Sequence, residues 1–578
     1  MRCATPARVS SCAVGGCAHN QVVLLIVVRE ADGYALRPLG GREAVPEHLG
    51  AAEFADLAVR WEREFTPRWV FTSVERDYAP LVAHGVRLGR CHDLALAEYL
   101  LLAHEGLHEQ SRGLAAAYAR ANGLPTPTDT GPDHFEADSQ PTLFDPTDPG
   151  LPEGVSTLDA AEQVLASQQR RINGLPRPDR MRLLVAAESA SALAAVEMSA
   201  DGLPWRADVH DLLLTELLGE KAASGLRPRR LAELAQRIQQ AFGGRPVNPD
   251  HPGSVVRAFS HAGIEVPSTR AHVLRRIDHP AVAPLLEYKE LARLHSAHGW
   301  AWLDQWVRDD RFRPVYVVGG VVSGRWASRG GAALQIPKVL RSCVRADPGW
   351  KLVVADAAQL EPRILAALSG DRELARVSES TDLYTSLATA MFARSPSAED
   401  RQHAKIAMLS AMYGSTAGEA ASLLVLLRQR FPTAVSYVEN AALEGERGEL
   451  VRSRLGRTSP PPSAAWRALT GGGADEEKAR RAARDWGRFT RNFVVQASAA
   501  DWTAVLLAAL RRSLPAPASL VFFQHDEVVV HSPTELAHQV CAALDDAVAE
   551  ATALVFGPAC PVRFPMPADV VDRYDEAR

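Results

Sequence analysis

The spacing of apolar residues predicts a strand-rich beginning of the chain. An apolar run at residues 22–28 is followed by Asp32-Gly33 and by a second, alternating stretch from Tyr34. An Asp-Gly pair between two such runs is typical of a β-hairpin. Helical periodicity follows at residues 53–64 and 94–107, and a segment dense in Pro, Thr, Asp and Gly then covers residues 124–152. We expect that segment to be a linker.

Helical periodicity dominates the chain from about residue 156. The strongest helical patterns lie at residues 181–198, 210–221, 230–242 and 286–306. Strand patterns return at residues 315–322, 351–354 and 520–531. The last two are short apolar segments that each run directly into a carboxylate. This pattern predicts an α/β body whose short central sheet carries acids.

Composition and charge narrow the class of protein. The 578 residues are 47% hydrophobic and 23% charged, which is typical of a globular chain with several domains. The net charge of −5 excludes a histone-like polycation. Residues 1–150 hold 13 basic and 20 acidic side chains and the remainder holds 51 and 49, so a polyanionic partner should prefer the body. The seven cysteines form no CxxC pair and the apolar run at 22–28 is too short to cross a bilayer, which predicts a cytoplasmic protein without a membrane segment.

Two acidic segments are candidates for metal binding. Asp356 ends the apolar strand that begins near Trp350, and Asp526 and Glu527 interrupt an apolar strand–turn–strand pattern. Charge is costly at such positions unless a partner neutralises it. Mg²⁺ would do so, because it prefers carboxylate oxygens together with substrate phosphates. Each acid alone could equally be a helix N-cap or a turn residue, and two such strands weaken that interpretation without excluding it.

A helical stripe is a candidate for nucleotide binding. Residues four apart share one helix face, which aligns Arg401, Lys405, Leu409 and Tyr413. Two cations, an apolar residue and an aromatic ring follow the order of phosphates, sugar and base in a nucleoside triphosphate. A solvated basic end on an amphipathic helix would explain the stripe as well if the helix stood alone.

Together these segments resemble the three signature motifs of family A (polymerase I-like) DNA polymerases. The family's D-Y-S-Q-I-E-L-R resembles D-A-A-Q-L-E-P-R at residues 356–363. Its R-x3-K-x7-Y-G is matched by Arg401, Lys405, Tyr413 and Gly414, and the last three positions of its V-H-D-E are matched at 525–527.

Further matches extend the resemblance over about residues 180–578. Ser323-Gly324-Arg325-Trp326 and Leu334-Gln335-Ile336-Pro337 resemble the family's T-G-R-L and L-Q-N-I-P segments. Residues 286–294 resemble its thumb helix, and Arg488, Asn492 and Gln496 followed by 497–501 resemble its R-x3-N-x3-Q-G-T-A-A-D helix.

The resemblance implies a template-dependent DNA polymerase that adds deoxynucleotides to a primer 3′ end, with two Mg²⁺ ions or, in their place, Mn²⁺. Asp356 and Asp526 would hold the metals, with Glu527 and Lys405 in the catalytic set. The deoxynucleoside triphosphate would meet Arg401, Lys405, Gln359, Glu361, Tyr384, Leu409 and Tyr413. Primer–template DNA would meet Arg325, Arg488, Asn492, Gln496 and His525. We expect a monomer that is nucleoid-associated and acts in repair or gap-filling replication.

The implied fold class is α/β (α+β multidomain). A right-hand polymerase with palm, fingers and thumb would follow a ribonuclease H-like, exonuclease-type domain. We expect that domain at 1–123, a linker at 124–155 and the polymerase at 156–578, without a 5′-nuclease domain. Within the polymerase the expected ranges are about 205–305 for the thumb, 310–375 and 500–578 for the palm, and 376–495 for the fingers.

Several positions depart from the family pattern. Ala357 and Ala358 replace Tyr-Ser, which removes a ring that supports Glu361, so we expect a less braced side chain there. Pro362 replaces an aliphatic residue, Tyr384 stands where the family has His, and Leu409 replaces an aromatic residue. The acids and phosphate cations remain, so rate and sugar selection should change more than activity itself. The alternative is a non-catalytic primer–template DNA-binding protein, which would not need all of these groups.

The front unit resembles a proofreading 3′–5′ exonuclease domain around Cys91-His92-Asp93 and, faintly, around Asp159. Proofreading needs Asp-x-Glu at the end of the first strand, but this chain has Glu30-Ala31-Asp32 and then Gly33. The Tyr expected four residues before Asp159 is Val155. We therefore expect a domain that folds without cleaving DNA and supports the body through the helix near Asp159.

Overall fold

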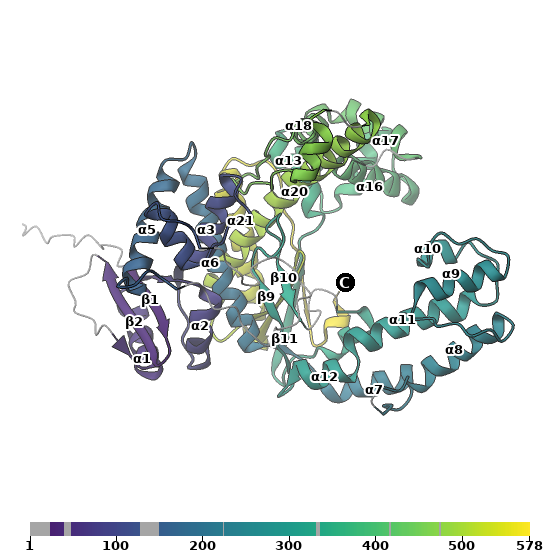
Figure 1. Cartoon of the computed structure of the whole chain (residues 1–578), viewed down its shortest axis with the longest axis horizontal. Helices are drawn as coiled ribbons and strands as arrows, with labels where there is room; N and C mark the ends of the chain where they lie inside the picture. Colours follow the sequence, from purple (N-terminus) through teal and green to yellow (C-terminus); the bar gives the residue numbers. More distant parts are fainter. Residues whose placement is uncertain are drawn as a thin grey trace, which may run out of the picture.

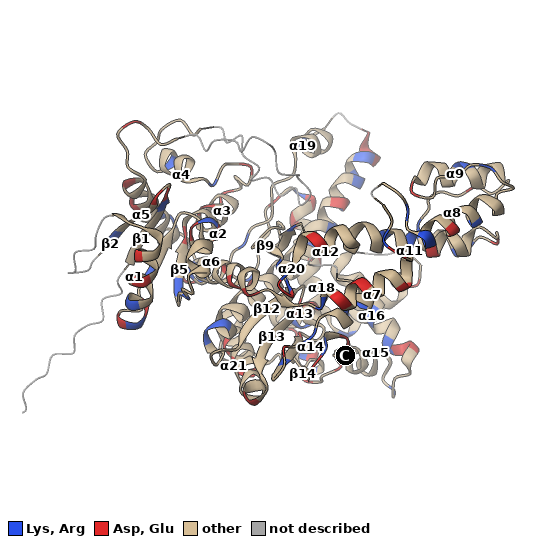
Figure 2. Ribbon diagram, turned by 90° about the horizontal axis from the view of Figure 1, so that it is seen from below, with Lys and Arg blue, Asp and Glu red and all other residues tan. Residues whose placement is uncertain are grey.

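The computed structural model describes residues 24–39, 48–127, 150–223, 225–330, 336–414, 418–472 and 475–577. Most of the expected linker, at 128–149, and the motif residues Leu334 and Gln335 lie outside these ranges. A front unit adjoins a central body, and two helical arms extend from that body (Figure 1). Acidic and basic residues are interspersed over most elements, in keeping with the nearly balanced charge (Figure 2).

The front unit contains a five-stranded sheet in the order β3-β2-β1-β4-β5. Strands β1 (Leu24–Glu30) and β2 (Gly33–Leu39) form the predicted hairpin, with Ala31-Asp32 as its two-residue turn. The other strands are β3 (His48–Leu49), antiparallel to β2, and β4 (Arg68–Phe71) and β5 (Arg90–Asp93), which run parallel to β1. Its helices are α1 (Ala51–Glu64), α2 (Val74–Ala83), α3 (Leu94–His104) and α4 (Leu114–Ala121).

Helix α5 (Thr157–Asn173) packs with the front unit. Its Leu158, Val164 and Leu165 are buried in one hydrophobic cluster with Ile26 of β1 and Val70 of β4. The boundary predicted at residue 156 therefore separates α5 from the sheet that it covers. Chain order puts this helix after the linker, whereas its packing puts it on the front sheet.

Helix α6 (Pro178–Asp201) joins the front unit to the body, because it packs against α2 and β5 and also against α20 (Glu476–Ser513) and β12 (Ser519–Gln524). The contacts between the front unit and the body thus include α6, whereas α5, the helix near Asp159, packs on the front sheet. By length and composition, α6 and α20 could each cross a membrane, but 72% and 89% of their apolar windows are buried inside the fold. They are core helices here.

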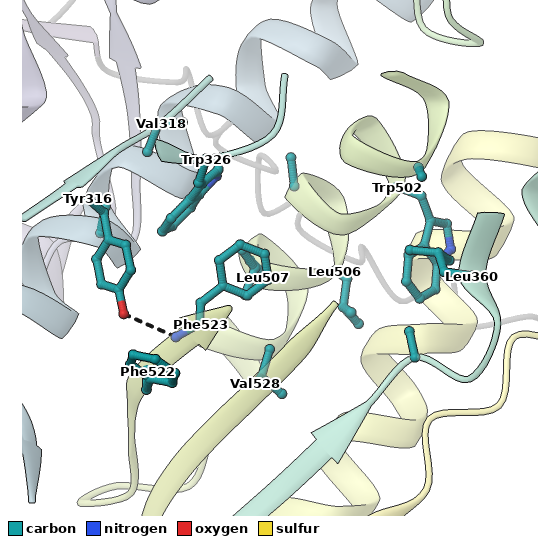
Figure 3. Close-up of a cluster of buried hydrophobic side chains, with 14 of the residues drawn as sticks. Tyr316, Val318, Trp326, Leu360, Trp502, Leu506, Leu507, Phe522, Phe523 and Val528 are labelled. Atoms are coloured by element: carbon teal, nitrogen blue, oxygen red, sulfur yellow. Dashed lines mark hydrogen bonds between the residues drawn. The ribbon is translucent and has the colours of Figure 1, made fainter. Parts of the chain in front are cut away.

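The body is built on a four-stranded antiparallel sheet in the order β12-β13-β11-β14. Its strands are β11 (Trp350–Asp356), β12 (Ser519–Gln524), β13 (Glu527–Pro533) and β14 (Ala568–Val571). Helices α20 and α21 (Ala537–Phe556) pack against these strands. Figure 3 shows Trp326 beside Phe523 of β12, where the Phe523 N–H donates to the Tyr316 hydroxyl at 3.2 Å.

One arm consists of helices α7 (Ala207–Leu218), α8 (Arg229–Ala241), α9 (Pro252–His261), α10 (Ala271–Leu274) and α11 (Val282–His298). The single helix predicted at 286–306 is instead α11 and α12 (Trp300–Trp306). The break falls at Gly299, whose ψ of −168° is extended rather than helical. Apolar periodicity continues through that residue, so the pattern alone does not reveal the break. A small sheet of β6 (Leu203–Pro204), β8 (Arg311–Phe312) and β7 (Val307–Arg308) lies at the base of this arm.

The other arm consists of helices α13 (Leu360–Ser369), α14 (Arg372–Val377), α15 (Leu383–Phe392), α16 (Ala398–Tyr413), α17 (Ala420–Arg430), α18 (Pro432–Glu446) and α19 (Ala464–Thr470). Pro362 lies in the first turn of α13, where a missing N–H is tolerated. The strand predicted at 315–322 is only β9 (Val315–Val317), paired with β10 (Ala327–Arg329), because the chain turns away at Gly319.

Candidate active site

The acids predicted from two distant segments meet at one edge of the central sheet. The register pairs Asp356 at the end of β11 with Glu527 at the start of β13. Asp526 precedes Glu527 in the turn from β12, and its carbonyl oxygen accepts a hydrogen bond from the Ala357 N–H at 3.1 Å. Antiparallel pairing therefore brings the two predicted metal ligands together.

Two non-glycine residues beside these acids adopt left-handed backbone conformations. His525 has a φ of 56° in the turn that carries Asp526, and Gln359 has a φ of 50° three residues after Asp356. Each such conformation costs about 1–2 kcal/mol for an L-residue with a side chain. Strain of this kind concentrates at ligand sites, where the surrounding packing fixes it. Two of the six non-glycine residues with positive φ in the described part of the chain therefore lie beside the acids.

Burial and mutual repulsion disfavour the charged forms of the acids. Burial, followed by the nearby Glu361 and Asp356 carboxylates, raises the pKa of Asp526 to about 6, while Arg325 opposes the shift. Burial also raises the pKa of Asp356, which Arg341 partly offsets. A divalent cation between the two carboxylates would remove this penalty.

The donor set fits a hard cation that keeps water and phosphate ligands. Asp356 and Asp526 offer carboxylate oxygens from adjacent strands, which is what Mg²⁺ requires from a protein when a substrate supplies the rest. Among the described residues, no group of three or more His, Cys, Asp or Glu side chains forms a closed metal cage. A cation held by Asp356 and Asp526 alone would keep positions free for water and phosphate ligands.

Glu527 is held by the C-terminal segment. Its carboxylate accepts a hydrogen bond from the Tyr574 hydroxyl and lies 3.8 Å from the Arg341 guanidinium. Arg341 in turn lies 4.3 Å above the Tyr574 ring. The sequence pattern missed Arg341 and Tyr574, because neither is near Asp356 or Glu527 along the chain.

The predicted helical stripe lies on α16. The Arg401 Nε donates to Asp382 Oδ2 at 2.8 Å, and Asp382 is also the N-cap of α15. The charged ends of Arg401 and Lys405 lie 5.8 and 6.0 Å from the centre of the Tyr384 ring, which is buried. Both predicted phosphate cations therefore project from one helix face over one aromatic ring.

Leu409 and Tyr413 complete the stripe differently from each other. Leu409 is half-buried against the hydrophobic core, whereas Tyr413 is 42% exposed at the end of α16. The hydroxyl of Tyr413 donates to Glu361 Oε2 at 2.6 Å, and Arg325 forms an ion pair with Oε1 of the same carboxylate. The ring missing at position 357 therefore does not leave Glu361 loose, contrary to the expectation from sequence.

Gln359 connects the sheet edge to the arm. Its Oε1 accepts a hydrogen bond from the Leu383 N–H at 2.9 Å, at the start of α15. This contact places the side chain between the acids and the helix that bears Tyr384. Its carbonyl oxygen is thereby engaged by the protein itself.

Arg363 is a buried residue that connects several backbone segments, a role that the motif match did not reveal. The side chain is fully buried and donates to the backbone carbonyl oxygens of Ala358, Ser378, Ser380, Thr381 and Arg563. These carbonyls belong to the loop after Asp356, the entry to α15 and the C-terminal part of the body. Arg363 therefore fixes the acid-bearing loop relative to the arm.

Three of the five residues predicted to contact DNA line one face of α20. Arg488, Asn492 and Gln496 are four residues apart and are exposed or half-buried. Arg488 packs against Gly414, where an added Cβ would lie 2.8 Å from the arginine Cγ. Asn492 hydrogen-bonds to Tyr413, and His525 is exposed in its turn. No contact joins Gln496 to the other predicted residues within the described part of the chain.

The acids of the front unit that were compared with a proofreading site have structural contacts instead. Asp93 is buried and caps α3 by accepting from the Leu96 N–H at 2.9 Å, and it also accepts from the Val74 N–H at 2.7 Å. Asp32 lies in the hairpin turn, and Asp159 pairs with Arg37 at 2.7 Å. The described residues do not gather these acids into one site.

An acid-bearing antiparallel sheet between two helical arms defines the right-hand class of nucleic acid polymerases. The sequence model described as DNA polymerase family A matches residues 223–570, so the chain belongs to that family. This confirms the predicted resemblance. Members of this family generally use divalent metal ions.

The relatives are polymerases of the same kind. The chain is 28% identical over 457 residues to the thermostable DNA polymerase I of Thermus filiformis, which covers 71% of this chain and 52% of that protein. It is 30% identical over 298 residues to the thermostable DNA polymerase I of Thermus aquaticus, covering 47% of this chain and 34% of that protein. The chain thus spans about half the length of the first of these relatives and about a third of the second.

The fold is similar to that of the POL domain of Pol1 from M. smegmatis, solved in complex with DNA primer-template and dNTP. The TM-score is 0.70 at 18% identity, over 96% of each chain. This confirms the predicted mixed helix-and-sheet polymerase architecture.

Proposed function

We propose that this chain is a template-dependent DNA polymerase that adds deoxynucleotides to a primer 3′ end. The observation that carries the proposal is the meeting of Asp356 and Asp526 at one sheet edge, beside an arm whose helix α16 bears Arg401 and Lys405. Family membership and the named activity of the relatives support it. The partners are primer–template DNA and deoxynucleoside triphosphates, as in the solved relative.

We further propose that Asp356 and Asp526 hold two Mg²⁺ ions, for which Mn²⁺ can substitute. When bound, such ions acidify the attacking hydroxyl and neutralise charge on the phosphates during in-line transfer. Glu527 faces Asp356 across the strands and holds its position through Tyr574 and Arg341. Its role is to fix the sheet edge on which the two ligands lie.

The chain's own cations would receive the triphosphate. Lys405 and Arg401 are on one helix face, and Arg401 exchanges its Asp382 partner for phosphate oxygens when nucleotide arrives. Tyr413 would lie near the templating base. Glu361, held at both oxygens, would occupy the space that a 2′-hydroxyl needs. These groups bind, orient and select the nucleotide.

The primer–template would lie along α20 and the acid-bearing turn. Arg325, Arg488, Asn492, Gln496 and His525 would contact it near the minor groove. Contacts of this kind position a duplex by its shape and carry little sequence information. A polymerase that must copy any template needs that property.

The front unit would have a structural role without proofreading. Tyr78 of α2 donates to Glu197 of α6 at 2.6 Å, and Glu197 pairs with Arg511 of α20 at 2.6 Å. A second contact joins His108 to the Thr458 carbonyl oxygen at 3.0 Å. These contacts support a unit that buttresses the body through α6 and α20.

Primer extension with and without Mg²⁺ tests the proposal. Extension by the parent and none by Asp526→Ala would support it. The alternative, a non-catalytic protein that binds primer–template DNA, would be favoured by tight DNA binding without extension in either metal. Action as a monomer in repair or gap-filling completes the proposal.

A further inference from the structure

A buried ion cluster lies beneath the loop that carries Arg325. Arg457 is 2% exposed and pairs with Glu188 of α6 and, at 3.0 Å from Nε to Oδ1, with Asp501 of α20. Both carboxylates are also buried. Two helices, α6 and α20, therefore each place a carboxylate on this guanidinium from a third part of the chain.

The cluster fixes the position of Arg457 tightly. Its backbone N–H donates to the Ser453 hydroxyl at 2.9 Å, and that hydroxyl donates to Asp501 at 2.6 Å. A buried guanidinium that pairs with two carboxylates has little conformational freedom, because movement away from either one would leave a buried charge without a partner. The guanidinium is thus a rigid surface at this point.

The loop at 321–325 rests directly on that surface. A Cβ added at Gly324 would lie 2.3 Å from Arg457 Nε and 2.4 Å from Cζ, so the α-carbon of the loop packs against the guanidinium. Gly324 also has a φ of 85°, which side chains disfavour. Only glycine allows this close approach.

The remaining contacts of the loop fix its backbone and direct the Arg325 side chain to Glu361. The loop closes on itself, since the Gly324 N–H donates to the Val321 carbonyl at 2.7 Å and the Val321 N–H donates to the Arg325 carbonyl at 3.0 Å. The residue after Arg325 is anchored in the core, since the Trp326 ring lies 5.0 Å from that of Phe523 (Figure 3). Arg325 then reaches Glu361.

From these contacts we infer that Arg457 is a positioning residue for sugar selection, acting through Gly324 and Arg325 on Glu361. This inference rests on the proposed function. Arg457 contacts Glu188, Asp501 and Gly324 rather than either predicted metal ligand. Its packing against Gly324 fixes the backbone position of Arg325. The ion pair with Arg325 in turn fixes the Glu361 carboxylate in the space that a 2′-hydroxyl would need. A small displacement along this series of contacts would move the Glu361 carboxylate and so change the preference for dNTP over rNTP.

Arg457→Lys tests the inference, because it keeps the charge and removes the planar fork. The matched control is Arg511→Lys, which alters a mostly buried ion pair between α20 and α6, the two helices that Arg457 bridges, but away from this loop. We expect Arg457→Lys to lower the preference for dNTP over rNTP by about tenfold and Arg511→Lys to leave it within about twofold. The ratio does not depend on how much of each variant is folded.

A double-mutant cycle shows whether the effect passes through Arg325. If it does, Arg325→Ala and the double variant Arg325→Ala/Arg457→Lys have the same preference. Equal effects of Arg457→Lys in both backgrounds, or an unchanged preference in the single variant, would overturn the inference. If Arg457→Lys does not fold, Glu188→Gln replaces it in the test, because that variant removes one of the two ion pairs of the Arg457 guanidinium.

Amide hydrogen exchange decides the inference even if the parent incorporates no nucleotide. Exchange of the amides at 321–325 should quicken in Arg457→Lys and not in Arg511→Lys, relative to the parent. Unchanged protection there would contradict the support role, whereas a parent without incorporation would contradict only the proposed function.

Discussion

The Tyr413 hydroxyl donates a 2.6 Å hydrogen bond to Glu361, joining the end of α16 to the start of α13. This contact spans 52 residues of sequence and holds one oxygen of the carboxylate, while Arg325 holds the other. Glu361 is therefore fixed between the arm and the sheet edge that bears the acids.

Tyr413→Phe should weaken discrimination against ribonucleotides while leaving extension with dNTPs largely intact. The change removes one hydrogen bond to a carboxylate, worth about 1.5–3 kcal/mol, without altering the ring. Single-nucleotide incorporation of dNTP and rNTP measures the ratio. Glu361→Ala should weaken it further, and an unchanged ratio in both variants would refute the steric role of Glu361.

Asp382→Asn should lower the KM for dNTP by about two- to fivefold, the range expected for loss of a half-exposed ion pair. Asp382 forms an ion pair with Arg401. Asparagine at this position would keep the N-cap of α15 and release the Arg401 guanidinium. The control is Asp371→Asn at the N-cap of α14, which accepts from the Leu374 and Ala434 N–H groups. A KM unchanged or raised in Asp382→Asn alone would contradict competition between Asp382 and phosphate.

The acids at the sheet edge were predictable because each interrupts an apolar strand, a local feature that one segment reveals. The supports of the site were not. Arg363 bonds to backbone carbonyls, which leave no trace in side-chain patterns, and Tyr574 reaches Glu527 across 47 residues. The packing of α5 into the front sheet depends on tertiary contacts that periodicity does not encode.

Without divalent metal, the stability of the protein should fall as pH rises towards about 6. Asp526 has its pKa raised from 3.8 to about 6, so its contribution is full below about pH 4 and is lost as pH rises through about 6. Thermal midpoints of the parent and Asp526→Asn, measured without metal from pH 4.5 to 7.5, test this. The difference between them should grow in favour of the variant, and parallel curves would contradict it.

The front unit should leave a 3′-mismatched primer intact in Mg²⁺ or Mn²⁺ without nucleotides. Asp93→Ala should instead lower the free energy of unfolding by about 1–2 kcal/mol, because it removes the cap of α3. Asp93→Asn keeps a cap and should cost less. Primer shortening that survives Asp356→Ala but disappears in Asp93→Ala would show an active exonuclease.

The most direct test of the account is single-turnover primer extension in Mg²⁺ by the parent, Asp356→Ala and Asp526→Ala, with primer–template affinity measured in parallel. We expect extension by the parent only, with DNA affinity largely kept in both variants, because affinity rests on many phosphate contacts and the acids serve the chemical step. Near-parental incorporation by either variant would contradict the assignment of the two acids.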